Sequence, residues 1–172
     1  MITNLDFFIL DIIKTLRCDF LDFVMPLITS LGNGGIIWII SGLLMLLFKK
    51  TRKMGITVLI SLLLSLIFCN LLIKPVVMRT RPFDLREIIL LIAPPTDFLF
   101  PSGHASASFA AAVSMYLNNK RYGKWAILLA SLIAFSRLYL YVHFPTDVLS
   151  GIALGTLLAF IANKITGKLK GI

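Results

Sequence analysis

Acidic residues and cysteines are scarce in this chain of 172 residues. Eight Asp and Glu residues stand against 17 Lys and Arg, and charged residues make up 15% of the sequence, whereas about 25% is usual in soluble domains. A disordered tail is excluded, because such segments are rich in charge and poor in apolar residues. The two cysteines, Cys18 and Cys69, are too few for a disulfide framework or a cysteine zinc site. No basic start leads to a small-residue cleavage site, so we expect no cleaved signal peptide.

Apolar side chains are abundant instead. Hydrophobic residues make up 58% of the chain and the mean hydropathy is +0.93, which is more than the core of a small soluble domain can bury. The surrounding solvent is therefore expected to be lipid, where backbone groups must pair within helices or closed barrels. Five apolar runs are too long and too uniform for barrel strands, so they predict membrane-spanning helices. They cover residues 34–48, 54–73, 102–117, 123–142 and 146–162.

The N-terminus has a different pattern. Within residues 4–22 charged residues interrupt the apolar ones, which recur at helical spacing: Leu5, Phe8, Ile9, Ile12, Ile13 and Leu16. This spacing favours an amphipathic helix in the membrane interface over a span. We therefore expect one all-α domain over residues 1–172. It is predicted to be a transmembrane bundle of five to six helices (34–172), preceded by an N-terminal interfacial helix or uncertain span (1–33).

The charges indicate how these helices are oriented. Three segments on one side of the predicted bundle are basic and contain no acid, and all eight carboxylates fall on the other side or at its edge. Basic residues mark the cytoplasmic side of a multi-pass membrane protein. The net charge of +9 therefore indicates membrane topology and no nucleic-acid partner. The basic residues are Lys49, Lys50, Arg52 and Lys53; Lys120, Arg121 and Lys124; and Lys164, Lys168 and Lys170.

Two cations seven residues apart, Lys74 and Arg81, open the long outward connection over residues 74–101, and Pro82 follows the second. Loops longer than about 12–15 residues in compact proteins tend to be functional or disordered. Lys74 and Arg81 are candidates for binding an anion. On this pattern alone, Lys74 and Arg79 could equally extend from a helix end towards lipid headgroups.

The same connection ends in Pro101-Ser102-Gly103-His104, directly before an apolar helix. Ser102 is a typical N-cap residue, and a helix N-terminus offers free N–H groups and a positive dipole end to an anion. Gly103 lets the backbone approach that anion closely. A plain helix cap with an incidental histidine is the alternative, but His104 in the first turn favours an anion site.

A third cluster contains Arg137, His143 and Asp147. Pro145 suits the first position of the next helix, which puts Asp147 in its first turn. The Asp147 carboxylate can there accept a hydrogen bond from His143 and hold the ring in one tautomer. The alternative is that this pair only caps the helix. Ionisable groups at membrane depth are costly, however, and are therefore functional candidates, Arg137 most of all.

All three clusters fall on one side of the predicted bundle, although the chain crosses the membrane twice between the second and the third. Together they predict a site for a phosphate dianion beside lipid. Aromatic and aliphatic residues near the clusters fit a cleft for a lipid tail, but the interfacial belt common in membrane proteins is the favoured interpretation. These residues are Phe83, Phe98, Leu99, Phe100, Tyr139, Tyr141 and Phe144.

In order and spacing, the clusters resemble the signature of the type 2 phosphatidic acid phosphatases, membrane relatives of bacterial acid phosphatases and vanadium haloperoxidases. That signature is Lys, six residues, Arg-Pro; then Pro-Ser-Gly-His; then Ser-Arg, five residues, His, three residues, Asp, and this chain matches it at residues 74–82, 101–104 and 136–147. The resemblance implies a metal-independent dephosphorylation in two steps, without a cofactor.

It also implies a role for each matching residue. His143, held by Asp147, would attack phosphorus to form a phosphohistidine, and His104 would protonate the leaving oxygen and then activate water. The remaining matches would neutralise the phosphoryl oxygens. They are Lys74, Arg81, Ser102, Gly103 and Arg137.

The favoured substrate within this family is undecaprenyl diphosphate, because that carrier is discharged on the outward face of a bacterial cell membrane, where the site is expected. Phosphatidylglycerol phosphate and the phosphate of lipid A are alternatives. A phosphotransferase that passes the phosphoryl group from His143 to a lipid hydroxyl is another, and a non-enzymatic membrane scaffold is the least favoured. Apart from the lipid substrate and the membrane, no partner and no oligomeric state are predicted.

Overall fold

The computed structural model describes residues 2–168, and Lys170 of the basic C-terminus lies outside this range. Residues 2–168 form helices and connecting loops without a strand, which confirms the all-α fold, and each of the five predicted apolar runs is helical. The elements are α1 (Ile2–Lys14), α2 (Asp19–Leu31), η1 (Asn33–Gly35), α3 (Ile36–Leu46), α4 (Arg52–Ser65), the π-helical η2 (Leu66–Ile73), α5 (Lys74–Val77), α6 (Pro82–Leu85), α7 (Gly103–Asn118), α8 (Lys120–Tyr139) and α9 (Pro145–Gly167).

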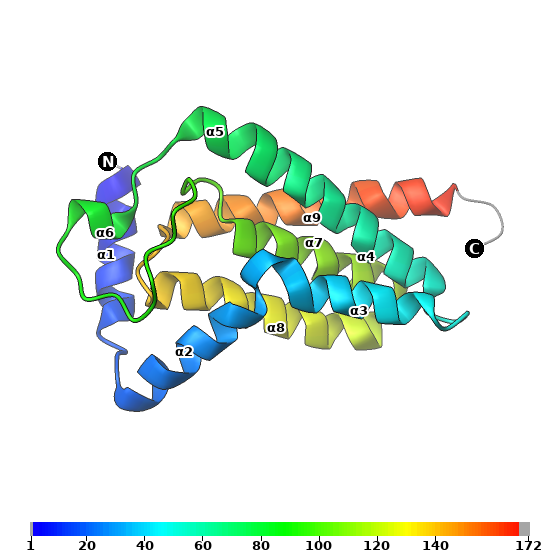
Figure 1. Ribbon diagram of the computed structural model, residues 1–172, viewed down its shortest axis with the longest axis horizontal. Coiled ribbons are helices and arrows are strands. Elements are labelled where there is room, and N and C mark those ends of the chain that lie inside the picture. The colour runs from blue at the N-terminus through cyan, green and yellow to red at the C-terminus, as the bar shows by residue number, and fades with distance from the viewer. Residues whose placement is uncertain (1, 169–172) are drawn as a thin grey trace.

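Helix α7 lies at the centre of the bundle, in contact with α4, α8 and α9, and α3 packs on α4 (Figure 1). Small side chains let helix backbones approach closely, and this packing holds helices together in lipid, where burial of apolar surface contributes little. The buried residues of α7 are accordingly almost all small: Ala105, Ser106, Ser108, Ala110, Ala111, Ala112, Ser114 and Met115.

Hydrogen bonds between side chains add to this packing. The hydroxyl of Ser65 on α4 lies 2.7 Å from that of Ser106 on α7. The Trp38 indole N–H on α3 donates to the Ser108 hydroxyl at 3.0 Å. Because an unpaired polar group in lipid costs several kcal/mol, about as much as a lost hydrogen bond in an apolar medium, these contacts favour one arrangement of α3 and α4 around α7.

The outer surface of the bundle is apolar, as contact with lipid requires. Leu43, Leu157 and Phe160 are each more than half exposed. Within the described part of the chain, two helical stretches are long and apolar enough to cross a membrane, Arg52–Leu85 and Pro145–Gly167. A third is added if the pair Asp19–Leu31 and Asn33–Leu46, bent by 44°, counts as one span. The chain is therefore a multi-pass membrane protein.

The N-terminal segment forms two helices: the predicted amphipathic helix is α1, which ends at Lys14, and α2 begins at Asp19. Helix α1 is amphipathic: Leu10 is fully buried, whereas Leu5 and Phe8 are 61% exposed. It lies across one end of the bundle (Figure 1). Helix α2 packs against α8, so part of the N-terminal segment belongs to the bundle. The break between α1 and α2 allows the chain to change direction from the end of the bundle to its side.

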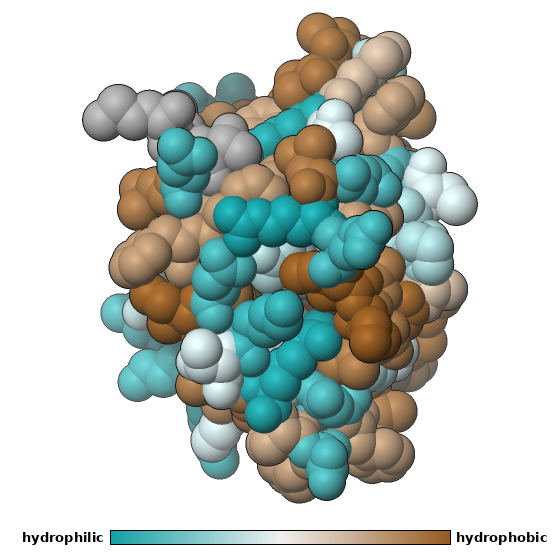
Figure 2. Space-filling view, turned by 90° about the vertical axis from the view of Figure 1, so that its left-hand side faces the viewer, coloured by the Kyte–Doolittle hydropathy of each residue, from teal (hydrophilic) through white to brown (hydrophobic). Residues whose placement is uncertain are grey.

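Basic and acidic segments separate to the two ends of the bundle. The α3–α4 turn, the α7–α8 turn and the C-terminal part of α9, which carry the basic residues, lie at one end (Figure 1). Helices α1 and α6 and the loop of residues 86–101 lie at the other, which we call the α1 end. Figure 2 looks onto the α1 end and shows hydrophilic side chains gathered near its centre, with hydrophobic ones around them.

The contact between α7 and α9 gives a test of the packing. A β-carbon added to Gly155 of α9 would lie 2.2 Å from the main-chain oxygen of Ser106. We expect Gly155→Ala to force the two helices apart and destabilise the protein by about 1–3 kcal/mol, seen as a lower melting temperature in detergent. Gly167→Ala is the control, because nothing among residues 2–168 lies within 4 Å of a β-carbon there. Equal melting of the two variants would contradict this packing.

Candidate active site

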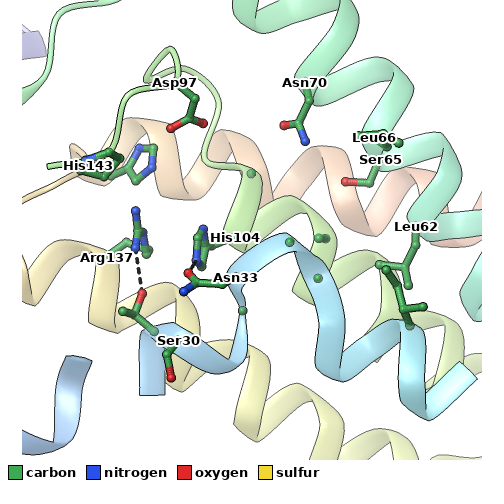
Figure 3. A pocket seen from close by; sticks show the side chains of 18 of the residues that line it. Ser30, Asn33, Leu62, Ser65, Leu66, Asn70, Asp97, His104, Arg137 and His143 are labelled. Atoms are coloured by element: carbon green, nitrogen blue, oxygen red, sulfur yellow. Dashed lines mark hydrogen bonds between the residues drawn. The ribbon is translucent and has the colours of Figure 1, made fainter. Parts of the chain in front are cut away.

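A cavity of about 740 Å³ lies between α2, α3, α4 and α7 and reaches the loop of residues 86–101. One part of its wall is polar and contains residues from all three predicted clusters; the other part is aliphatic. In Figure 3, Asp97, His104, Arg137 and His143 lie around the polar part, and Leu62 lies farther along α4. The polar part includes Lys74, Asp97, His104, Arg137 and His143, and the aliphatic part Ile39, Leu59, Leu62, Leu63 and Leu66.

Asp97 lies between the two cations of the first cluster. Its carboxylate forms ion pairs with Lys74 Nζ and with Arg81 Nη2, the latter at 2.8 Å. Burial alone raises the pKa of Asp97, but the hydrogen bond and charge of Lys74 and the charge of Arg81 outweigh it and lower this pKa. The carboxylate is therefore ionised at neutral pH.

Arg81 was predicted to bind the anion, but its side chain does not line the cavity. It is 4% exposed and lies behind Asp97. Its Nη1 donates to the main-chain oxygen of Val142, and its Nη2 donates to that of Asp97, both at 2.8 Å. Arg81 therefore joins the loop before α7 to the turn that carries His143. No motif marks Asp97 in the sequence, so its place in the site was not predicted.

His104 is the second residue of α7, and its Nε2 lies 3.0 Å from Oδ1 of Asn33 (Figure 3). Asn33 begins η1, where Gly34 and Gly35 have φ values of 59° and 68°. Glycine adopts these left-handed conformations without strain, so the chain can turn from α2 into α3 beside α7. The hydrogen bond fixes the orientation of the His104 ring. Asn33 was not predicted, although Asn-Gly-Gly is a turn signal in the sequence.

Ser102 caps α7 as predicted, and its hydroxyl accepts from the N–H of Ala105 at 3.4 Å. Its own N–H donates to the main-chain oxygen of Asp147 at 3.0 Å, which joins the starts of α7 and α9. The Ser102 side chain is fully buried and does not line the cavity, whereas Gly103 does. An anion in the cavity would therefore meet the backbone of Gly103 and not the Ser102 hydroxyl.

His143 follows a tight turn after α8. Tyr141 in this turn has a φ of 60°, rare for a bulky residue, and its hydroxyl donates to Asp11 of α1 at 2.9 Å. His143 is 2% exposed, and its Nδ1 has no hydrogen-bond partner among residues 2–168. Burial, followed by the charges of Arg137 and Arg81, lowers the pKa of His143 well below its ordinary value. The imidazole is therefore neutral at neutral pH and keeps a lone pair.

Arg137 brings a buried positive charge to the cavity. It is 3% exposed, and its Nη1 donates to the Thr29 hydroxyl at 2.8 Å. Within the part of the chain that the structure describes, its Nε finds no hydrogen-bond partner. An unsatisfied buried donor is costly, and an anion in the cavity would satisfy it.

Asp147 lies close to His143 without the predicted hydrogen bond. Nδ1 of His143 and Oδ2 of Asp147 are 3.8 Å apart, which is longer than a hydrogen bond. Oδ2 instead accepts from the N–H of Phe144 at 2.7 Å, and Oδ1 from Arg79 at 2.5 Å. Arg79 also pairs with Asp6 of α1 at 2.7 Å. Arg79 thus ties α1 to the start of α9, and the interpretation that it faces lipid headgroups was wrong.

Several of the aromatic and aliphatic residues predicted as a tail cleft or belt belong to the core. Leu99, Tyr141 and Phe144 are at most 1% exposed and pack against Phe7 and Leu10 of α1. They hold α1 against the loops at this end. The aliphatic wall of the cavity comes from α3, α4 and η2 instead.

No group of three or more His, Cys, Asp or Glu side chains within residues 2–168 could hold a metal ion. Independence of metals and cofactors remains a prediction from the resemblance.

Residues 55–170 match the PAP2 superfamily. The match covers more than half of the chain and includes all three motifs. The chain belongs to the PAP2 superfamily. The family resemblance stated above is thereby confirmed.

Similar proteins include several lipid phosphatases. An undecaprenyl-diphosphatase of Sulfolobus acidocaldarius is 38% identical over 141 residues, 79% of this chain and 68% of the relative. A lipid A 4'-phosphatase of Bacteroides thetaiotaomicron is 28% identical over 98% of this chain and 82% of its own. The crystal structure of a transmembrane PAP2 type phosphatidylglycerolphosphate phosphatase from Bacillus subtilis has a TM-score of 0.79 and 29% identity, covering 99% and 88% of the two chains. This PAP2 member therefore has the same fold as a solved relative over almost its entire length.

The Arg79 ion pairs can be tested by mutation. Arg79→Ala leaves Asp6 and Asp147, which are 2% and 0% exposed, without their cation. Removing one partner of a buried pair costs about 3–5 kcal/mol, so we expect a large fall in the melting temperature in detergent.

Arg86→Ala is the matched control for this prediction. Arg86 also pairs with α1, through Asp11, but the two side chains are 45% and 50% exposed. Exposed ion pairs contribute about 0–1 kcal/mol, so this variant should melt close to the wild type. A fall of the same size in both variants would contradict the special role of Arg79.

Proposed function

We propose that this PAP2 protein hydrolyses a lipid phosphate or diphosphate through a phosphohistidine on His143. One observation carries the proposal: a single cavity joins two histidines and two cations in its polar part to aliphatic side chains of α3, α4 and η2. A phosphate needs positive charge and N–H donors, and a hydrocarbon tail needs apolar contacts. A lipid phosphate needs both at once, whereas a water-soluble phosphate ester would leave the aliphatic part unused.

The first step forms a bond between a nitrogen of His143 and phosphorus while the bond from phosphorus to the leaving oxygen breaks. The lowered pKa of His143 supports this role, because only the neutral ring has a lone pair for attack. His104 donates a proton to the leaving oxygen. Asn33 holds the His104 ring in place through its hydrogen bond.

In the second step water attacks phosphorus, His104 accepts a proton from that water, and the nitrogen–phosphorus bond breaks. His143 is thereby regenerated and phosphate is released. Lys74, Arg137 and the backbone of Gly103 contact the phosphoryl oxygens, and Arg81 contributes its charge from behind Asp97. Asp147 accepts a hydrogen bond from the Phe144 N–H and so holds the neighbouring His143 in position. It makes no direct hydrogen bond to His143 in this conformation.

We further propose undecaprenyl diphosphate as the substrate, with phosphatidylglycerol phosphate and lipid A as alternatives. The support is the relative named undecaprenyl-diphosphatase, 38% identical to this chain. The cavity is also at the α1 end, away from the basic segments, and by the positive-inside rule that end is extracytoplasmic. A carrier lipid discharged on the outer leaflet would reach the site there.

Phosphate release by purified protein tests this function. We expect faster release from undecaprenyl diphosphate than from phosphatidylglycerol phosphate or lipid A. His143→Ala removes the nucleophile and should lower turnover at least about 10³-fold, and His104→Ala should lower it by about 10²–10⁴-fold.

Ser114→Ala is the control for both histidine variants. Ser114 of α7 is also buried, its hydroxyl has no hydrogen-bond partner among the described residues, and it does not line the cavity, so turnover should be unchanged. Wild-type turnover by His143→Ala would overturn the mechanism. Phosphoryl transfer that depends on an added acceptor lipid would indicate a phosphotransferase.

The role of the cations gives a separate prediction. Lys74, Arg81 and Arg137 supply the positive charge that a divalent metal would otherwise provide in the transition state. Phosphate release should therefore proceed at an unchanged rate in excess EDTA. Loss of turnover in EDTA that returns on addition of magnesium would contradict this part of the mechanism.

A further inference from the structure

The Asp97 carboxylate contacts the two cations that the proposed function assigns to the phosphate. One oxygen pairs with Lys74 Nζ and the other lies 2.8 Å from Arg81 Nη2. Asp97 also lines the cavity, beside His104 and His143. Lys74 Nζ has further N–H groups, but both Nη2 contacts of Arg81 go to Asp97, and the N–H that faces the carboxylate cannot be directed at a phosphoryl group at the same time. Two anions this close also repel each other, so the carboxylate and a phosphate compete for this position.

We propose that Asp97 is an internal competitor of the substrate: its carboxylate holds the phosphoryl subsite between Lys74 and Arg81 and leaves when a phosphate binds. This inference rests on the proposed function and names a residue that sets the affinity and selectivity of the same site.

The contacts of Asp97 allow this exchange without opening the loop. Arg81 holds the main-chain oxygen of Asp97 at 2.8 Å, independently of the carboxylate. Arg81 is held in turn by the main-chain oxygen of Val142. The Asp97 side chain is 58% exposed, so the carboxylate can rotate towards water and be solvated there. The backbone stays in place while Lys74 Nζ and one N–H of Arg81 become available.

The charges around the cavity explain what the competition achieves. Asp97 is the one carboxylate among the residues that line the cavity within the described chain, and it faces the cations Lys74, Arg81 and Arg137. A monoanion carries no more charge than the carboxylate, so replacing the bound carboxylate with it yields little binding free energy. A phosphate dianion gains more, since it carries more charge and more acceptor oxygens. The competition therefore favours phosphate over common monoanions, at a cost in affinity.

Binding of inorganic phosphate to the full chain in detergent, measured by isothermal titration calorimetry, tests the proposal without turnover. Asp97→Asn keeps the shape of the side chain and removes its charge. The apparent Kd equals the intrinsic Kd divided by the fraction of molecules whose site is free. If Asp97 occupies the site in about nine of ten molecules, Asp97→Asn should bind phosphate about tenfold more tightly than the wild type. Asp97→Ser should do the same and provides a second variant.

Glu87→Gln is the matched control, because Glu87 lies in the same connection, is exposed and does not line the cavity. Its phosphate Kd should equal that of the wild type. Unchanged or weaker binding by both Asp97 variants would overturn the proposal and indicate that Asp97 positions the two cations. A gain of equal size in Glu87→Gln would overturn it too, because a general charge effect would then suffice, and so would the absence of phosphate binding by every variant.

Turnover separates this inference from the proposed function. With lipid substrate, Asp97→Asn should lower KM about tenfold and make released phosphate a stronger inhibitor. If the wild type released no phosphate from any lipid, the proposed function would fail regardless of the calorimetry. If the wild type is active and Asp97→Asn binds phosphate no more tightly, only the competitor role fails.

Discussion

Asp6, Arg79 and Asp147 form a buried group of charges on which the geometry of the α1 end depends. Two carboxylates with almost no solvent contact require a cation between them, and Arg79 supplies it with hydrogen bonds of 2.7 and 2.5 Å. The guanidinium also lies 4.2 Å from the centre of the Phe144 ring. Meeting this requirement brings α1, the segment after α5 and the start of α9 together. Asp147 can then hold the Phe144 N–H, and the turn that carries His143 has one position.

The surrounding lipid explains why the site is a cavity with two kinds of wall. In the bundle, close approach of small residues on α7 to its neighbours leaves little space, and the buried hydroxyls of Ser65 and Ser106 pair with each other. The cavity lies where the α2–α3 turn, α4 and the start of α7 face one another, and it reaches the loop of residues 86–101. The wall at membrane depth is aliphatic, and the wall at the end of the bundle is polar. A ligand with a charged head and an apolar tail matches this arrangement.

The polar wall of the cavity has more positive than negative charge and contains buried polar atoms without hydrogen-bond partners among the described residues. Arg137 Nε and His143 Nδ1 are buried without hydrogen-bond partners among residues 2–168. Burial, and then the positive charge of Arg137 and Arg81, lowers the pKa of His143 and keeps its ring neutral. Asp97 offsets part of this charge at Lys74 and Arg81. In the proposed mechanism, the same cations keep His143 neutral, attract the phosphate and hold the Asp97 carboxylate. The unsatisfied N–H of Arg137 is costly in the folded protein, and an anion in the cavity could accept from it.

Hydropathy, charge and motif spacing are properties of neighbouring residues, so the sequence alone determined the apolar helices, the separation of basic from acidic ends, the Ser102 cap and the start of α9 at Pro145. It also brought Lys74, His104, Arg137 and His143 to one side of the membrane. Only the tertiary structure decided that Arg79 meets Asp6, 73 residues away, and that Asn33 meets His104, 71 residues away. It likewise decided that Asp97 lies in front of Arg81. Asp6, Asn33 and Asp97 lie on segments without a motif, and which side chains they meet depends on how the helices pack in three dimensions.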